Sequence, residues 1–203
     1  MPIIYHEQAK EFHLFNDEVS YIIGIMENGQ MENLYYGKAL RDREDFSHFH
    51  EETMRSQMSV CVPEPGLLSM HYTRQEYPVY GTGDYKSPAL CIRQEDGSRI
   101  TNFVYKDYKI LKGKPSLAPL PATYVEDDGE GDTLEITLHD DKINTDMVLS
   151  YTIYKDYPVI TRNTRFLQKG ESSIVLEKAM SACVEFLDMD FEMVQLSGAW
   201  ARE

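Results

Sequence analysis

Cysteines are few in this sequence, and they follow no recognisable pattern. There are three, Cys61, Cys91 and Cys183, so their number is odd and their spacing is wide. A disulfide scaffold needs paired cysteines at regular spacings, and a common class of zinc site needs a Cys-x-x-Cys pair. The sequence has neither pattern and favours reduced thiols in a cytoplasmic protein.

Long apolar runs and positive charge are also scarce. No run approaches the roughly 18 apolar residues needed to span a bilayer. The first residues lack the basic and apolar regions of a signal peptide. With 34 acidic and 20 basic residues, the formal net charge is −14. Because such a surface repels phosphate backbones and anionic lipids, we expect neither nucleic acid nor a membrane as a partner.

Motifs for metals, cofactors and nucleophiles are incomplete or missing. Residues 48–52 (HFHEE) begin like a His-Glu-x-x-His zinc motif, but Met54 stands where the second histidine is needed. Residues 81–86 (GTGDYK) lack the third glycine of a dinucleotide loop, and Pro88 lies where its helix would begin. No Gly-x-Ser-x-Gly elbow occurs. The residues therefore predict no metal site, no cofactor and no catalytic centre.

The sequence does contain many short alternating runs. In residues 133–139, Leu134, Ile136 and Leu138 share one face of a predicted strand, and Glu135 and Thr137 share the other. Residues 147–154 alternate in the same way. Their shared apolar face is expected to include Leu149, Tyr151 and Ile153, packed inward between two sheets with the first set.

Turn signals separate these runs. Residues 19–26 and 31–37 flank Asn28-Gly29, which predicts a β-hairpin. Further strands are predicted at residues 159–166, 173–180 and 182–186. The polar stretch at residues 41–58 has no helical periodicity and is expected to form a long loop. Many short strands in one chain predict a single all-β domain built as an antiparallel sandwich or barrel.

Six blocks, in order along nearly the whole chain, carry a resemblance to a known family. They are Phe12-His13-Leu14, residues 34–38 (LYYGK), residues 75–78 (QEYP) followed by Gly81, Asp84 and Pro88-Ala89, residues 112–115 (KGKP), residues 120–125 (LPATYV) and residues 196–203 (LSGAWARE). Together they resemble the N-terminal domain of glycoside hydrolase family 36 α-galactosidases.

The resemblance implies an antiparallel β-supersandwich of the galactose mutarotase type over residues 1–203. It also implies a parent enzyme that hydrolyses terminal α-D-galactosyl residues of melibiose- or raffinose-type sugars with retention. Retention needs two carboxylates about 5–5.5 Å apart. In the family both are Asp residues of a following (β/α)8 barrel, and the nucleophile's motif is Lys-Trp-Asp. Here Trp200, the single Trp, stands between Ala199 and Ala201, so we expect a fragment without catalytic residues that is inactive alone.

Further expectations follow from the same resemblance. The family's β domain runs past the Gly-Ala-Trp block, so the chain is expected to lack its last strands as well as the barrel, which would be its main partner. Family members are often homo-oligomers in which a β-domain loop approaches a neighbour's active site. In this sequence Arg55 is the counterpart for that substrate-proximal loop, with Glu51 and Glu52 beside it. Trp200 is expected either to be buried or to stack on a sugar ring.

Two other functions remain open. An independent carbohydrate-binding module would need exposed aromatic side chains. Two groups of tyrosines supply them, Tyr77, Tyr80 and Tyr85 in one and Tyr151, Tyr154 and Tyr157 in the other. An aldose epimerase would need a His acid and a Glu base facing one sugar, for which His71, His139 and Glu135 are available.

Overall fold

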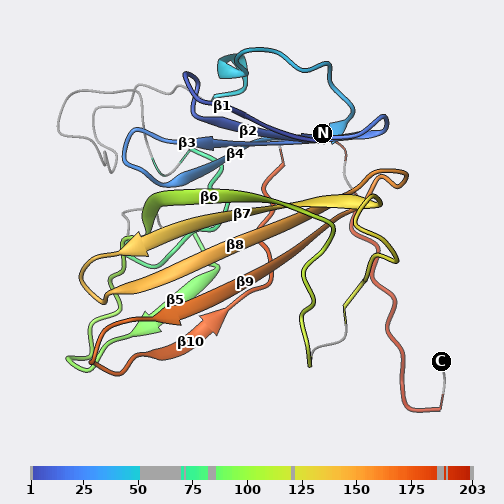
Figure 1. Cartoon of the computed structure of the whole chain (residues 1–203). Helices are drawn as coiled ribbons and strands as arrows, with labels where there is room; N and C mark the ends of the chain where they lie inside the picture. Colours follow the sequence, from blue (N-terminus) through green and yellow to red (C-terminus); the bar gives the residue numbers. More distant parts are fainter. Residues whose placement is uncertain are drawn as a thin grey trace.

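Antiparallel β-sheets make up the regular structure of the described part of the chain (Figure 1). The computed structural model describes residues 2–50, 70, 72–81, 86–119, 122–186, 190 and 192–201. One sheet has the order β1-β2-β3-β4, formed by β1 (Ile3–His6), β2 (Glu11–Phe15), β3 (Val19–Ile25) and β4 (Met31–Lys38). A second has the order β6-β7-β8-β9, formed by β6 (Val104–Lys112), β7 (Gly131–Asp140), β8 (Thr145–Tyr154) and β9 (Ile160–Gln168).

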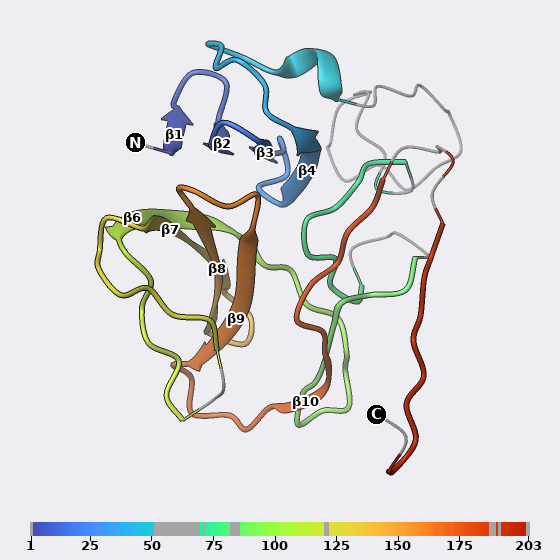
Figure 2. The ribbon, with the colours of Figure 1, turned by 90° about the vertical axis from the view of Figure 1, so that its right-hand side faces the viewer.

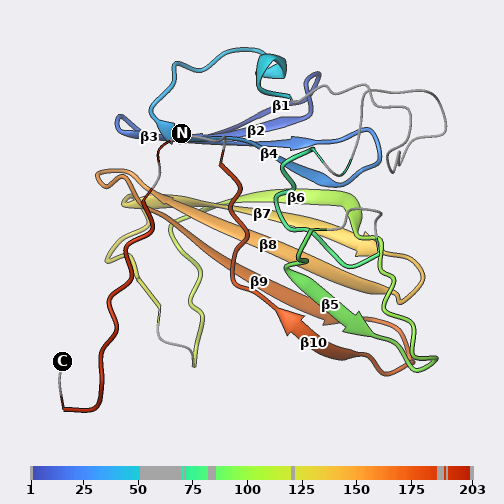
Figure 3. The same cartoon turned by 180° about the vertical axis from the view of Figure 1, so that it is seen from behind.

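A two-stranded ribbon accompanies these sheets. It pairs β5 (Leu90–Arg93) with β10 (Val175–Ala179) and lies near β9 (Figure 3). The helical content of the described residues is the short 3-10 turn η1 (Ser47–Phe49), and none of these residues forms a helix long enough to cross a membrane. The predicted all-β antiparallel fold is therefore confirmed.

The core lies between the β1–β4 and β6–β9 sheets, which face each other in Figure 2. All six apolar residues predicted to point inward from β7 and β8 are buried: Leu134, Ile136, Leu138, Leu149, Tyr151 and Ile153. Glu135 and Thr137 are less buried than their neighbours, as the alternation predicts. Phe12 and Tyr21 join the core from the opposite sheet. The alternation of apolar and polar residues thus fixes the register of β7 and β8, because a shift by one residue would turn the apolar side chains away from the core between the two sheets.

The hairpin predicted around Asn28-Gly29 is confirmed as β3 and β4. Gly29 has φ +80, a left-handed conformation that strains other residues. The amide of Gly29 donates to the carbonyl of Met26 at 2.8 Å, and the amide of Met26 donates to the carbonyl of Gln30 at the same distance. The turn therefore closes on itself through backbone bonds.

The strand predicted at residues 182–186 is wrong. This segment has no regular structure, and Val184 and Phe186 are about half exposed. A strand exists only where a neighbouring backbone completes its hydrogen bonds. Here the guanidinium of Arg162, a side chain, binds the carbonyl of Cys183 at 3.1 Å. The expected long loop is confirmed as far as residue 50, apart from the turn η1.

Candidate functional site

Residues 39–50 form a loop that covers the outer face of the β1–β4 sheet (Figure 1). Phe46 is its apolar anchor and packs on Ile22 and Leu34. The guanidinium of Arg74 donates to the carbonyls of Leu34 at 3.2 Å and Phe49 at 2.9 Å. The loop is therefore held on the sheet by the packing of Phe46 and by the hydrogen bonds of Arg74.

One group of polar contacts joins Asp42 to two histidines. Asp42 Oδ1 lies 3.0 Å from Nε2 of His6 on β1 and 2.8 Å from Nδ1 of His13 on β2. Burial lowers the pKa of His13, and the hydrogen bond with Asp42 opposes this shift. Burial raises the pKa of Asp42, but the hydrogen bonds from His13 and His6 outweigh it and lower the pKa overall.

A second group joins His50 to Glu32 and Glu11. His50 Nδ1 lies 2.6 Å from a carboxylate oxygen of Glu32 on β4, and its Nε2 lies 3.8 Å from Glu11 on β2. Glu11 also accepts the backbone N–H of Phe46 at 2.7 Å. Burial raises the pKa of Glu11, while the bond from Phe46 and the charge of His50 lower it in part. Both groups hold the first part of the loop on the sheet.

The residues predicted for a substrate-proximal loop lie beyond this anchored part. Arg55, Glu51 and Glu52 lie outside the described residues. The described part of the chain thus contains residues 41–50 of the predicted loop and the contacts that hold them on the sheet.

Trp200 lies in the C-terminal segment, which extends away from the sheets (Figure 1). Its side chain is 97% exposed, and the described residues provide it with neither a hydrogen-bond partner nor an aromatic neighbour. The alternative of burial is therefore wrong for this chain. Other large apolar side chains in the last part of the described chain are exposed too: Met180, Val184, Phe186, Met193, Val194 and Leu196.

A polar network connects the two main sheets inside the core. Glu76 is fully buried, and its Oε1 lies 2.5 Å from Nη2 of Arg162 on β9. The hydroxyl of Tyr21 on β3 donates to Glu76 at 2.7 Å, and that of Tyr151 on β8 donates at 2.8 Å. Asn33 adds a fourth contact at 3.0 Å.

This network is structural in character. Burial opposes the charge of Arg162, but Glu76 and the two tyrosines raise its pKa overall. Burial and the charge of Glu76 raise the pKa of both Tyr21 and Tyr151 well above the usual value. The tyrosines therefore stay protonated, and every carboxylate oxygen of Glu76 is engaged, so the network offers no free acid or base.

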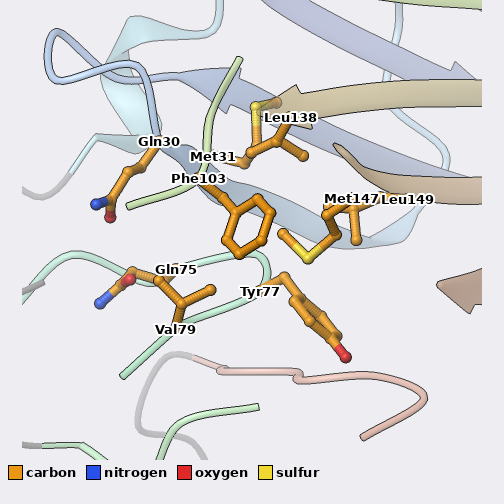
Figure 4. A pocket seen from close by; sticks show the side chains of 9 residues that line it. All are labelled: Gln30, Met31, Gln75, Tyr77, Val79, Phe103, Leu138, Met147 and Leu149. Atoms are coloured by element: carbon orange, nitrogen blue, oxygen red, sulfur yellow. The ribbon is translucent and has the colours of Figure 1, made fainter. Parts of the chain in front are cut away.

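A small cavity beside this network has no room for a sugar (Figure 4). Its volume is about 10 Å³, close to the space of one water molecule. Core side chains, among them Phe103, Tyr77 and Leu149, surround it. It is a packing defect of the core rather than a ligand site.

The tyrosines suggested for carbohydrate binding are mostly buried. Tyr77, Tyr151 and Tyr154 belong to the core, while Tyr80 and Tyr157 are exposed. Tyr85 lies outside the described residues. Among its described members, each group therefore has a single exposed ring. One isolated ring does not form the flat aromatic surface on which a pyranose ring could stack.

The residues suggested for an epimerase are already engaged with other partners. His139 Nδ1 lies 2.6 Å from Asp146, and Glu135 lies 2.5 Å from Arg165. His71 lies outside the described residues. The described pair therefore forms separate ion pairs on the outer face of β7 and not a shared acid–base site.

The fold and these contacts define an all-β antiparallel domain whose described polar clusters brace its sheets and a surface loop. A family model, the glycosyl hydrolase family 36 N-terminal domain, matches residues 29–203. The chain belongs to this family of N-terminal domains.

Known relatives are much longer proteins. α-Galactosidase AgaA of Geobacillus stearothermophilus is 39% identical over 203 residues, which are 100% of this chain and 28% of that protein. α-Galactosidase 1 of Pediococcus pentosaceus is 36% identical, again over 100% of this chain and 28% of the relative. The chain thus spans little more than a quarter of the relatives it matches.

Solved structures agree with this relationship. The crystal structure of the family 36 α-galactosidase AgaB from Geobacillus stearothermophilus superposes with a TM-score of 0.82 and 39% identity, over 90% of this chain and 24% of that one. The α-galactosidase from Lactobacillus brevis gives a TM-score of 0.83 at 30% identity, over 88% and 24% of the two chains. The fold described above is therefore the fold of the N-terminal part of these enzymes.

Sequence reasoning missed the two histidine–carboxylate groups. Asp42 is 36 residues from His6 and 29 from His13, so no local motif joins them. The available signal was alternation, since His13 and Glu11 are two residues apart on β2 and therefore share a face.

Proposed function

We propose that this chain serves as the non-catalytic N-terminal domain of an α-galactosidase that hydrolyses terminal α-D-galactosyl residues. The observation that carries the proposal is the alignment of the whole chain with 28% of AgaA at 39% identity. Retaining hydrolysis needs two carboxylates about 5–5.5 Å apart. The family's Lys-Trp-Asp nucleophile motif does not occur in this sequence, so the chemistry is assigned to a separate catalytic part.

The exposed apolar side chains support a packing role. Leu196 is 93% exposed and Met193 is 88% exposed, and Trp200 lies on the same segment. Several large apolar side chains exposed on one short segment are unusual unless the segment meets a partner surface. A catalytic domain seated on this segment would remove these side chains from water.

A chimera tests the proposal. The N-terminal part of AgaA that aligns with this chain is replaced by residues 1–203, and galactose release from a chromogenic α-galactoside is measured. We expect activity from the chimera and none from the chain alone or from AgaA without its N-terminal part. Turnover by the chain alone, abolished by a carboxylate substitution within it, would overturn the proposal. So would full activity of AgaA without that part.

We propose that the segment around Arg55 approaches substrate in a homo-oligomer. Support comes from the resemblance and from the anchored base of the loop, held by Arg74 and the histidine–carboxylate groups. In the chimera, Arg55→Ala should raise KM for the galactoside and leave the oligomer mass, measured by light scattering, unchanged. Lys142→Ala, an exposed residue in the turn between β7 and β8, is the control. An unchanged KM in Arg55→Ala would contradict this role, and a monomeric active chimera would contradict the oligomer.

A further inference from the structure

His6, His13 and Asp42 bring three metal-ligating atoms together on the outer face of the β1–β4 sheet. The three atoms all lie within 4.8 Å of one another. The pairing of β1 with β2 sets His6 opposite Glu11 and Ile4 opposite His13, so the two histidines are diagonal neighbours on one face. Asp42 approaches both from the loop above.

We propose that this group is a divalent transition-metal site of the zinc class. Imidazole nitrogen and carboxylate oxygen are ligands that Zn²⁺ prefers, at about 2.0–2.2 Å. Tetrahedral ligands at that distance are about 3.3 Å apart by geometry. Asp42 Oδ1 lies 3.0 Å and 2.8 Å from the two nitrogens, and all three atoms lie within 4.8 Å of one another, so modest movements of the Asp42 and His6 side chains would admit the ion. The side chain of Asp42 is 31% exposed, which leaves a path for water as the fourth ligand.

The surroundings of His13 hold its ring in the orientation that a ligand needs. His13 Nε2 lies 3.0 Å from Ser20 Oγ, which also accepts the backbone N–H of Leu40 at 2.9 Å. The ring lies between Phe15 and Phe46, with centroids 4.4 Å and 5.0 Å away. In the metal-free chain Nδ1 of His13 donates to Asp42; when Nδ1 gives up this proton to bind the ion, the ring keeps its other proton on Nε2 and donates it to Ser20. Such outer contacts fix the tautomer and orientation of metal-binding histidines.

The charge around the group also favours a cation. Glu11, directly opposite His6 in the pairing of β1 with β2, adds a second carboxylate to the same face. The group at His139 differs, because Asp146 there is already paired with Lys106 and Lys169, whose charges repel a metal ion. Among the described residues, the site at His6 is the one where three ligating atoms converge.

A bound ion would tie β1, β2 and the loop of residues 39–50 to one another. These ligands come from three separate elements, so the site exists only in the folded chain and binding stabilises the fold. At an ion concentration about 100 times the dissociation constant, the folded-to-unfolded ratio rises about 100-fold. For a domain of this size the melting temperature rises by about 5–10 °C.

The test is a calorimetric titration of the chelator-treated chain with ZnCl2, together with thermal unfolding in ZnCl2 and in EDTA. We expect one ion per chain and a higher melting temperature in ZnCl2. His6→Ala and Asp42→Asn should abolish both effects, and His48→Ala, an exposed histidine of the same loop, should retain them. Asp42→Asn keeps a hydrogen-bond acceptor of the same shape, and circular dichroism verifies its fold.

Two outcomes would overturn the proposal. The first is a wild-type chain that takes up no zinc and melts at one temperature in both solutions, because Asp42 is then a hydrogen-bond acceptor only. The second is uptake that persists in His6→Ala and Asp42→Asn, because the ligands then lie elsewhere, for example at the cysteines.

Discussion

Arg162 and Glu76 form a buried ion pair between the two main sheets, with 2.5 Å separating Nη2 and Oε1. The guanidinium carbon of Arg162 also lies 5.1 Å from the ring centre of Tyr151, so the cation faces an aromatic surface. Glu76 lies on the segment of residues 72–81, which runs beside β4, while Arg162 lies on β9. The segment is therefore joined to one layer by its backbone and to the other layer by this ion pair.

Glu76→Gln should destabilise the chain by about 3–5 kcal/mol, because it leaves the buried charge of Arg162 without a counter-ion. Urea unfolding measures the change in the free energy of unfolding. Glu177→Gln is the matched control. It removes an exposed pair with Arg93 and Arg99, for which a much smaller loss is expected because water screens exposed charges. Equal losses in the two variants would contradict the structural role given to the buried network.

Leu149→Ala should cost about 2–5 kcal/mol, since it opens a cavity between the sheets where Leu149 is 1% exposed. Thr137→Ala, on the outer face of β7, should change stability by no more than about 0.5 kcal/mol. Both values come from urea unfolding under the same conditions. If Thr137→Ala proved the more harmful change, the assignment of the two faces would be wrong.

Protonation of Asp146 in acid should lower the stability of the chain. Burial raises its pKa, but hydrogen bonds from Lys169, His139 and Lys106 outweigh this effect and lower the pKa from 3.8 to about 2. Because the folded pKa lies below the unfolded one, this stabilisation is complete above about pH 4 and is lost as the pH falls toward 2. The loss amounts to at most about 2 kcal/mol, because water screens the charges of Lys106 and Lys169, whose side chains are about half exposed.

Urea unfolding over that pH range measures the effect through a comparison of variants. Asp146→Asn should flatten the acid slope of stability relative to the wild type. Asp141→Asn is the matched control, since it removes a carboxylate that also contacts His139, at 3.3 Å, but whose side chain is 96% exposed. An identical slope in wild type and Asp146→Asn would show that the carboxylate titrates normally.

Trp200 should report a water-exposed environment in the isolated chain. As the sole Trp, it accounts for the whole indole emission, which is expected to be red-shifted and fully quenched by acrylamide. An uncharged quencher is needed, because the net charge of −14 repels iodide. Trp200→Phe should change stability by at most about 0.5 kcal/mol. Blue-shifted emission that resists quenching would mean that the C-terminal segment packs inward.

Local patterns were sufficient for the strands that alternate and for the hairpin. Leu134, Ile136 and Leu138 reveal their face by spacing alone, because successive side chains of a strand point to opposite sides. Gly29 similarly marks its turn by a conformation that few other residues adopt. The family resemblance followed from short blocks in order, and the family assignment is confirmed over residues 29–203. Each of these features depends on residues that lie close together in the sequence.

Tertiary structure alone decided which distant residues meet. The prediction for residues 182–186 failed because an apolar run specifies a strand only if a backbone partner lies beside it. The convergence of Asp42 with His6 and His13 spans 36 and 29 residues, and the pairing of Glu76 with Arg162 spans 86. The sequence by itself determined the faces, turns and family of this chain. Its ion pairs and its histidine cluster depend on how the sheets and the loop pack together, which no local spacing encodes.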